Sequence, residues 1–120
     1  MDAAMPLIAL AIACTAIDGD TLRCGREHVR LIGIDAPEMP GHCRRGRVCV
    51  KGDPFRARRA LILVLRRRPL MIERMGFDRY GRTLARLTAG GVDLGCAQLR
   101  SGNAVYVRKW DRGGRAGACV

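Results

Sequence analysis

The chain has 120 residues, and its 22 lysine and arginine side chains outnumber 11 aspartate and glutamate side chains to give a formal net charge of +11. This length predicts one domain, residues 1–120, and the hydrophobic content of 48% predicts a folded globular protein rather than a disordered one. No apolar run approaches the roughly 18 to 20 residues that a membrane span requires. The surplus of cations, most of them arginine, favours a polyanionic partner such as nucleic acid, because guanidinium groups bind phosphate oxygens in pairs. A basic surface without a partner is the alternative.

Strand patterns occupy the first third of the chain. Residues 7–17 and 21–24 are typical of two strands, which the turn at Asp18-Gly19-Asp20 joins. Residues 28–34 predict a third strand, and Pro37 ends it. A polar loop rich in glycine and arginine is expected to follow.

The second half of the chain predicts two helices and two further strands. The first helix is expected to begin at Asp53-Pro54, with the aspartate as N-cap and the proline in the first turn, and to run to about Arg67. Two strands are expected at residues 70–75 and 82–88. A second helix is expected at 93–101, and a loose tail at 111–120. Three strands, a helix, two strands and a helix predict an α+β, mainly β fold, a five-stranded OB-fold barrel with two short helices.

Six cysteines, an even number, suit disulfides formed in an oxidising compartment, so we expect a secreted or periplasmic protein. Six cysteines allow about fifteen full pairings, so the sequence does not settle their connectivity. Local geometry favours Cys14–Cys24 across the first turn and Cys43–Cys49 around a short Arg/Gly segment, which would leave Cys96 and Cys119 as the remaining pair. Six reduced thiols are the alternative, and the spacing of the cysteines and histidines matches no usual zinc pattern. The apolar segment from Pro6 to Cys14 resembles the core of a secretory leader, but no basic residue precedes it.

Acidic residues lie where the first and third predicted strands end. These two strands run in the same direction, so their carboxyl ends meet at one edge and bring Asp20, Asp35 and Glu38 together. Three acids repel one another unless a cation lies between them, and carboxylate and carbonyl oxygens suit Ca²⁺ or Mg²⁺. Strict alternation places Arg30 on the face opposite Asp35, so either Asp35 lies beyond the regular strand or Gly33 marks a bulge.

Three motifs occur in order along the chain: Asp-Gly-Asp-Thr at 18–21, Arg-Leu-Ile-Gly-Ile-Asp-Ala-Pro-Glu at 30–38 and Asp-Arg-Tyr-Gly-Arg at 78–82. Together they resemble the signature of the staphylococcal nuclease family, whose members are OB-fold, calcium-dependent nucleases. The resemblance covers roughly residues 10–107. The family's longer C-terminal helix is expected to be absent, because little sequence follows the second predicted helix.

This resemblance implies a metal and a residue that handles the attacking water. The metal would be calcium, bound by the carboxylates of Asp20 and Asp35 and by the backbone carbonyl of Ala36. Glu38 matches the acid that activates or orients the water.

The resemblance also implies residues that bind the substrate's phosphates. Arg30 and Arg82 match the two arginines that hold the scissile phosphate. Arg79 and Tyr80 match positions that contact a terminal phosphate of a nucleotide.

The function expected from this resemblance is that of a monomeric, calcium-dependent endonuclease that cleaves DNA and RNA with little sequence preference. One alternative is a non-catalytic OB-fold module that binds single-stranded nucleic acid, and another is a disulfide-stapled structural protein. Tyr106 or Trp110 is either a base-stacking residue or part of the core.

Overall fold

The computed structural model describes residues 13–119, so the predicted strand that starts at residue 7 lies partly outside the described range. Three strands form an antiparallel meander: β1 (Cys14–Asp18), β2 (Thr21–Cys24) and β3 (Glu27–Leu31). The sheet continues through β6 (Thr83–Ala89), which is parallel to β3, to β5 (Leu70–Phe77). The short strand β7 (Val92–Asp93) pairs with β6.

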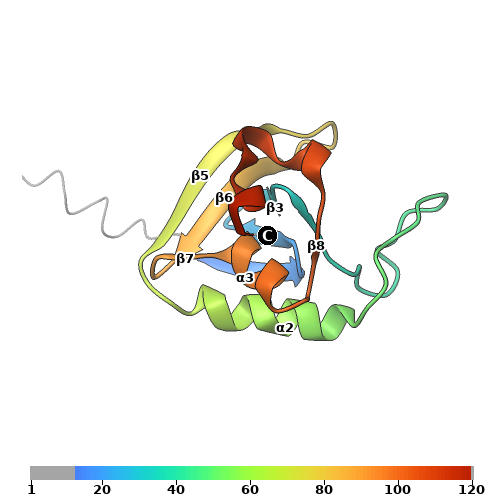
Figure 1. Ribbon diagram of the computed structural model, residues 1–120, viewed down its shortest axis with the longest axis horizontal. Coiled ribbons are helices and arrows are strands. Elements are labelled where there is room, and N and C mark those ends of the chain that lie inside the picture. The colour runs from blue at the N-terminus through green and yellow to red at the C-terminus, as the bar shows by residue number, and fades with distance from the viewer. Residues whose placement is uncertain (1–12, 120) are drawn as a thin grey trace, which may run out of the picture.

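The path of the sheet is β1-β2-β3-β6-β5. Figure 1 labels β3, β6 and β5 of this path. Within residues 13–119 no strand pairing joins β1 to β5. The fold is therefore a mixed α/β arrangement around an open multistranded sheet, and the closed five-stranded barrel is not confirmed.

The third predicted strand is interrupted at Gly33. Regular β3 ends at Leu31, Gly33 adopts a left-handed φ of +73°, and a separate strand β4 (Ile34–Asp35) follows. This strand pairs with β8 (Val105–Tyr106), outside the main sheet. The prediction of one continuous strand over 28–34 is therefore wrong, and Asp35 lies beyond the regular strand because the chain turns at the glycine.

Two helices cover the sheet, as the sequence predicts. The first, α2 (Pro54–Leu65), is N-capped by Asp53, whose carboxylate accepts hydrogen bonds from the backbone of Phe55 and Arg56 at 3.0 and 3.2 Å. It packs against β1, along the lower edge of Figure 1. The second, α3 (Leu94–Arg100), is N-capped by Asp93. No helix in residues 13–119 is long and apolar enough to cross a bilayer.

A buried glutamine of α3 fixes the first turn against α2. The amide of Gln98 donates to the carbonyl of Gly19 at 2.7 Å and to that of Ala57 at 2.8 Å. A Cβ atom placed on Gly19 would lie only 2.7 Å from the Cβ of Ala57, so the turn needs a glycine here to approach the helix. This contact holds the turn Asp18–Asp20 in one position.

The segment after β8 is ordered, which corrects the expectation of a loose tail. It forms three 3₁₀ turns at Arg108–Trp110, Arg112–Gly114 and Ala116–Cys119. The carboxylate of Asp111 accepts hydrogen bonds from the backbone of Ala116 and Gly117 at 3.0 and 2.9 Å, and Ala116 enters the core. Asp111 therefore stabilises this segment as an internal cap.

All three expected disulfides are present: Cys14–Cys24, Cys43–Cys49 and Cys96–Cys119. The first links β1 to β2, and the third ties the final 3₁₀ turn to α3. The second closes a short ring within the loop between β4 and α2, which extends away from the rest of the molecule at the right of Figure 1. The alternative of six reduced thiols is therefore not what the structure shows.

Glu27 joins strands β3, β5 and β6 through its carboxylate. It accepts hydrogen bonds from Arg74 at 2.7 and 2.9 Å and from the hydroxyl of Thr83 at 2.6 Å. The bonds from Arg74, and then that from Thr83, lower the pKa of Glu27 from 4.5 to about 2.

This pKa predicts how stability responds to acid. A carboxyl group with a depressed pKa stabilises the folded state above its unfolded pKa, and that stabilisation is lost as the pH falls through the folded pKa. We therefore expect the free energy of unfolding to decrease as the pH falls from 4.5 to about 2. Glu27→Gln should have a smaller free energy of unfolding at neutral pH, and this energy should decrease less in acid. Urea unfolding across this range measures the effect, with Glu73→Gln on exposed β5 as control. The same acid profile in Glu27→Gln and wild type would contradict it.

Candidate active site

The structure places the two acidic motifs at one edge of the sheet. Asp20 follows the first turn and is almost fully buried. One of its carboxylate oxygens accepts a hydrogen bond from the backbone N–H of Ala36 at 2.7 Å, and the other accepts one from the hydroxyl of Thr21 at 2.8 Å. The first turn and the segment after β4 are therefore joined directly, as the meander predicts.

Arg30 lies between the two buried aspartates. Its Nη1 atom donates to the carbonyls of Leu31 and Ile34, both at 2.9 Å, and thereby closes the turn at Gly33. Its Nη2 atom lies 3.4 Å from Asp20 and 3.5 Å from Asp35. The guanidinium group thus lies on the same side of the chain as the Asp35 carboxylate, because the backbone turns at Gly33 and the regular strand ends before it.

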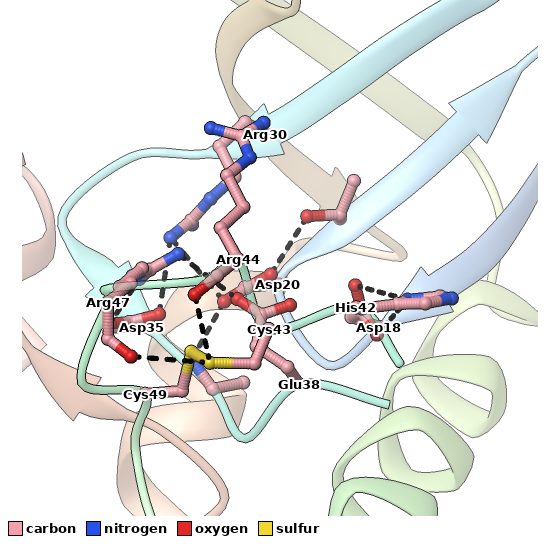
Figure 2. Close-up of polar contacts among 12 residues, drawn as sticks. Asp18, Asp20, Arg30, Asp35, Glu38, His42, Cys43, Arg44, Arg47 and Cys49 are labelled. Atoms are coloured by element: carbon pink, nitrogen blue, oxygen red, sulfur yellow. Dashed lines mark hydrogen bonds and ion pairs between the residues drawn. A yellow bond between two sulfur atoms is a disulfide. The ribbon is translucent and has the colours of Figure 1, made fainter. Parts of the chain in front are cut away.

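A second arginine, which the sequence analysis did not single out, contacts the same cluster. Arg47 comes from the ring closed by Cys43–Cys49. It donates to Asp35 at 2.9 Å and to Glu38 at 3.3 Å (Figure 2). The sequence shows that Arg47 belongs to a loop rich in arginine and glycine. It does not show that this loop folds against the acidic residues, because an irregular loop has no periodic pattern.

Burial and like charges raise the pKa values of two carboxyl groups here. Burial is the largest cause for Asp35, and Arg47 and Arg30 oppose it. For Glu38, burial followed by the charges of Asp20 and Asp18 raises the pKa to about 7, with Arg47 opposing. Glu38 is therefore held close to the pKa that general acid–base chemistry requires at neutral pH.

Asp18 anchors the start of the loop that carries Arg47. Its carboxylate accepts a hydrogen bond from the backbone of Met39 at 2.9 Å and lies 3.1 Å from the Nδ1 atom of His42 (Figure 2). The chain on either side of Glu38 is thus tied to the first turn, which fixes the position of that carboxylate.

A cavity of about 640 Å³ opens beside the acid cluster. Eight basic side chains contribute to its lining: Arg30, Arg44, Arg45, Arg47, Arg79, Arg82, Lys109 and Arg112. Such a concentration of guanidinium groups suits a chain of phosphates.

The loop between β5 and β6 supplies one wall of this cavity. The Nε atom of Arg82 donates to Asp78 at 2.6 Å, which orients the guanidinium group. The ring of Tyr80 is half exposed, and the guanidinium carbon of Arg44 lies 3.5 Å from its centroid. Arg79 donates to the hydroxyl of Tyr80 at 2.9 Å. The residues expected to bind phosphate therefore face the same cavity as Arg30.

Residues 28–117 match the sequence model of the family described as staphylococcal nuclease homologue, which covers most of the chain. The chain belongs to the staphylococcal nuclease homologue family. Members of this family are generally nucleases that bind nucleic acids and typically require Ca²⁺. The matched range contains Arg30, Asp35, Glu38 and Arg82, whereas Asp20 lies before it. No curated protein sequence matched the chain.

The donor set of this family member fits a hard cation. The carboxylates of Asp20, Asp35 and Glu38 and the carbonyl of Ala36 all offer oxygen, which calcium prefers. After burial, the charges of Asp20 and Asp18 are the next causes that raise the pKa of Glu38, so negative charges lie close together here. However, no three acidic, histidine or cysteine side chains among residues 13–119 are arranged as ligands around one point. Arg30 lies between Asp20 and Asp35, and the guanidinium group of Arg47 contacts Asp35 and Glu38.

The two aromatic residues near the end of the chain have different surroundings. The hydroxyl of Tyr106 donates to Asp111 at 2.8 Å, and its ring packs against the core. Trp110 lies in the cavity lining, is 38% exposed, and has Arg30 5.4 Å from its ring centroid. Tyr106 is therefore a core residue, and Trp110 is the one placed to contact a base.

Proposed function

We propose that this protein is a calcium-dependent endonuclease that hydrolyses phosphodiester bonds in DNA and RNA with little sequence specificity. The observation that carries the proposal is that Arg30 and Arg47, which contact the buried cluster of acids, also line a cavity with eight basic side chains. A cluster of oxygen donors beside a phosphate-binding cavity is what metal-assisted phosphodiester hydrolysis requires.

Asp20, Asp35 and the backbone carbonyl of Ala36 would hold the calcium ion. When bound, the ion would polarise a phosphate oxygen and help to fix the attacking water. Asp20 is held by the N–H of Ala36, so these two donors keep a fixed relative position. Such preorganisation lowers the free energy needed to assemble the site.

Glu38 would accept the proton of the attacking water. In the metal-free protein, burial and the charges of Asp20 and Asp18 raise the pKa of Glu38 to about 7, which makes this carboxylate a stronger base than an ordinary glutamate. Arg30 and Arg82 would stabilise the charge that develops on the phosphate. Arg79 and Tyr80, on the same loop as Arg82, would contact a neighbouring phosphate.

Three further properties belong to this proposal. Contacts to phosphate oxygens carry no sequence information, which accounts for low specificity. The three disulfides suit a secreted or periplasmic location, where they persist. We also propose that the protein acts as a monomer, since the acid cluster and the cavity are both built from one chain.

The proposal predicts cleavage that depends on calcium. Purified protein should cut single- and double-stranded DNA and RNA when Ca²⁺ is added, and a chelator should abolish the cutting because the acid cluster then lacks its ion. Product sizes on a denaturing gel report the reaction. Asp20→Asn, prepared in parallel, should be nearly inactive and excludes a contaminating nuclease.

The alternative is an OB-fold-like module that binds single-stranded nucleic acid without cutting it. The basic cavity and the exposed ring of Trp110 favour binding of this kind. Tight binding by fluorescence anisotropy, with no cleavage under any divalent cation, would establish this module and refute the endonuclease.

A further inference from the structure

We propose that Arg47 is a third arginine of the active site, a tethered cation that binds Asp35 and Glu38 and competes with the divalent metal ion for Asp35. The inference rests on the calcium site of the proposed function and adds an internal competitor to it. Arg47 would hold the two carboxylates in the metal-free protein and leave them when the ion binds.

The contacts of Arg47 place a positive charge on Asp35, a proposed ligand of the metal, and on Glu38 beside it. Its two terminal nitrogens divide between two acids, Nη2 on Asp35 at 2.9 Å and Nη1 on Glu38 at 3.3 Å. Both acids are largely buried, with side chains 9% and 13% exposed. Charge-assisted bonds to partly desolvated carboxylates are stronger than those at the open surface.

The position of Asp35 sets Arg47 and the metal ion in competition. One of its oxygens faces Arg30 and the other accepts from Arg47, so a guanidinium group faces each oxygen. An ion bound by Asp35 needs at least one of these oxygens. Arg30 is held in place by two backbone carbonyls, whereas Arg47 is 35% exposed at its side chain and lies on a loop. Arg47 is therefore the group that gives way.

The disulfide keeps this competitor close to the site. Cys43 and Cys49 are six positions apart, and inside their ring the N–H of Arg47 donates to the carbonyl of Arg44 at 3.1 Å. The chain that leads into the ring is anchored on Asp18 through Met39. A short closed loop limits how far the guanidinium group can move, which gives it a high effective concentration at the carboxylates.

A displaced Arg47 would still have a partner. Its guanidinium carbon lies 5.8 Å from the ring centroid of Trp110, and its side chain lines the basic cavity. The paired N–H donors of a guanidinium group that bind a carboxylate also fit two oxygens of a phosphate. Entry of the metal ion would thus release an arginine toward the place where the substrate's phosphates bind.

Isothermal titration of Ca²⁺ into the metal-free protein, without substrate, tests the competition. If Arg47 occupies the acids in about nine molecules of ten, its removal should tighten calcium binding by about tenfold. Arg47→Ala should bind calcium about tenfold more tightly than wild type. Arg47→Lys should show a smaller gain in affinity, because lysine keeps the positive charge but lacks the paired nitrogens of the guanidinium group. Arg45→Ala is the matched control, since it removes one charge from the same ring. The calcium-induced rise in Tm gives a second readout that also reports whether each variant is folded.

A further variant tests the tether. Cys43→Ser combined with Cys49→Ser opens the ring but leaves Arg47 in place. Calcium binding should tighten here too, by less than in Arg47→Ala, because the arginine is then less often at the carboxylates.

The outcomes separate this inference from the proposed function. Calcium binding of equal strength in wild type, Arg47→Ala and Arg45→Ala would overturn the competition and leave the calcium site intact. Equal gains in Arg47→Ala and Arg45→Ala would also overturn it, because a general charge effect would then suffice. No calcium binding by any variant would refute the calcium site itself, and the competition with it.

Discussion

Glu38→Gln is expected to slow phosphodiester cleavage by about a hundred- to ten-thousandfold, the range associated with a positioned general base. Glutamine has nearly the same size but cannot accept a proton. The same variant should be at least as stable as wild type when metal is absent, because burial and the charges of Asp20 and Asp18 disfavour the ionised carboxylate. Loss of activity without loss of stability distinguishes a functional group from a structural one.

Single-turnover cleavage measures the expected loss of rate. Urea unfolding in the presence of chelator measures the free energy of unfolding of the metal-free protein. Glu73→Gln removes an exposed carboxylate of β5 and serves as control, with wild-type cleavage expected. If Glu38→Gln cuts at the wild-type rate and still requires calcium, another group takes the proton of the water.

Arg30→Ala is expected to destabilise the protein by about 3–5 kcal/mol, as removal of one partner from a buried ion pair does. The Arg30 side chain is 9% exposed, and the aspartates that it separates are 2% and 9% exposed. The variant leaves both carboxylates without this cation and two carbonyls at the Gly33 turn without their donor. Because the contacts to the carbonyls are the shorter ones, much of the loss should come from the turn.

Arg30→Lys separates the structural role from the catalytic one. Lysine restores the charge and part of the stability, but a single ammonium group cannot reach both the carbonyls and the phosphate. We expect it to fold and to cleave about a hundred- to a thousandfold more slowly, the usual cost of losing one preorganised donor. Urea unfolding and single-turnover cleavage are the measurements. Arg86→Ala, which removes partly exposed ion pairs on β6, is the control, with a smaller loss of stability than Arg30→Ala. Full activity in Arg30→Lys would contradict this role.

Features set by local chemistry were predictable from the sequence. Asp53 and Pro54 begin a helix because the carboxylate can cap backbone donors that the first turn leaves unpaired, and the structure shows that cap. Cys14 and Cys24 pair because a tight turn places them opposite each other in the hairpin. The meeting of Asp20 with the segment around Asp35 followed from the direction of neighbouring strands alone.

Features that depend on distant contacts were not predictable in this way. Gly33 interrupts its strand because β4 leaves the main sheet to pair with β8, some seventy positions later in the chain. The segment after Asp111 is ordered because that side chain caps it from within and Ala116 packs into the core.

The sequence alone determined the family and the two helices, since each depends on neighbours or on motifs of fixed spacing. It favoured the disulfide pairs without settling them, and the structure selected the pairing. Only the tertiary structure placed Arg47 on Asp35 and Glu38 and brought Trp110 beside Arg30. The physical reason is that an irregular loop has no periodicity from which its direction can be inferred. Where its side chains lie is decided by the charges and surfaces that it meets after folding.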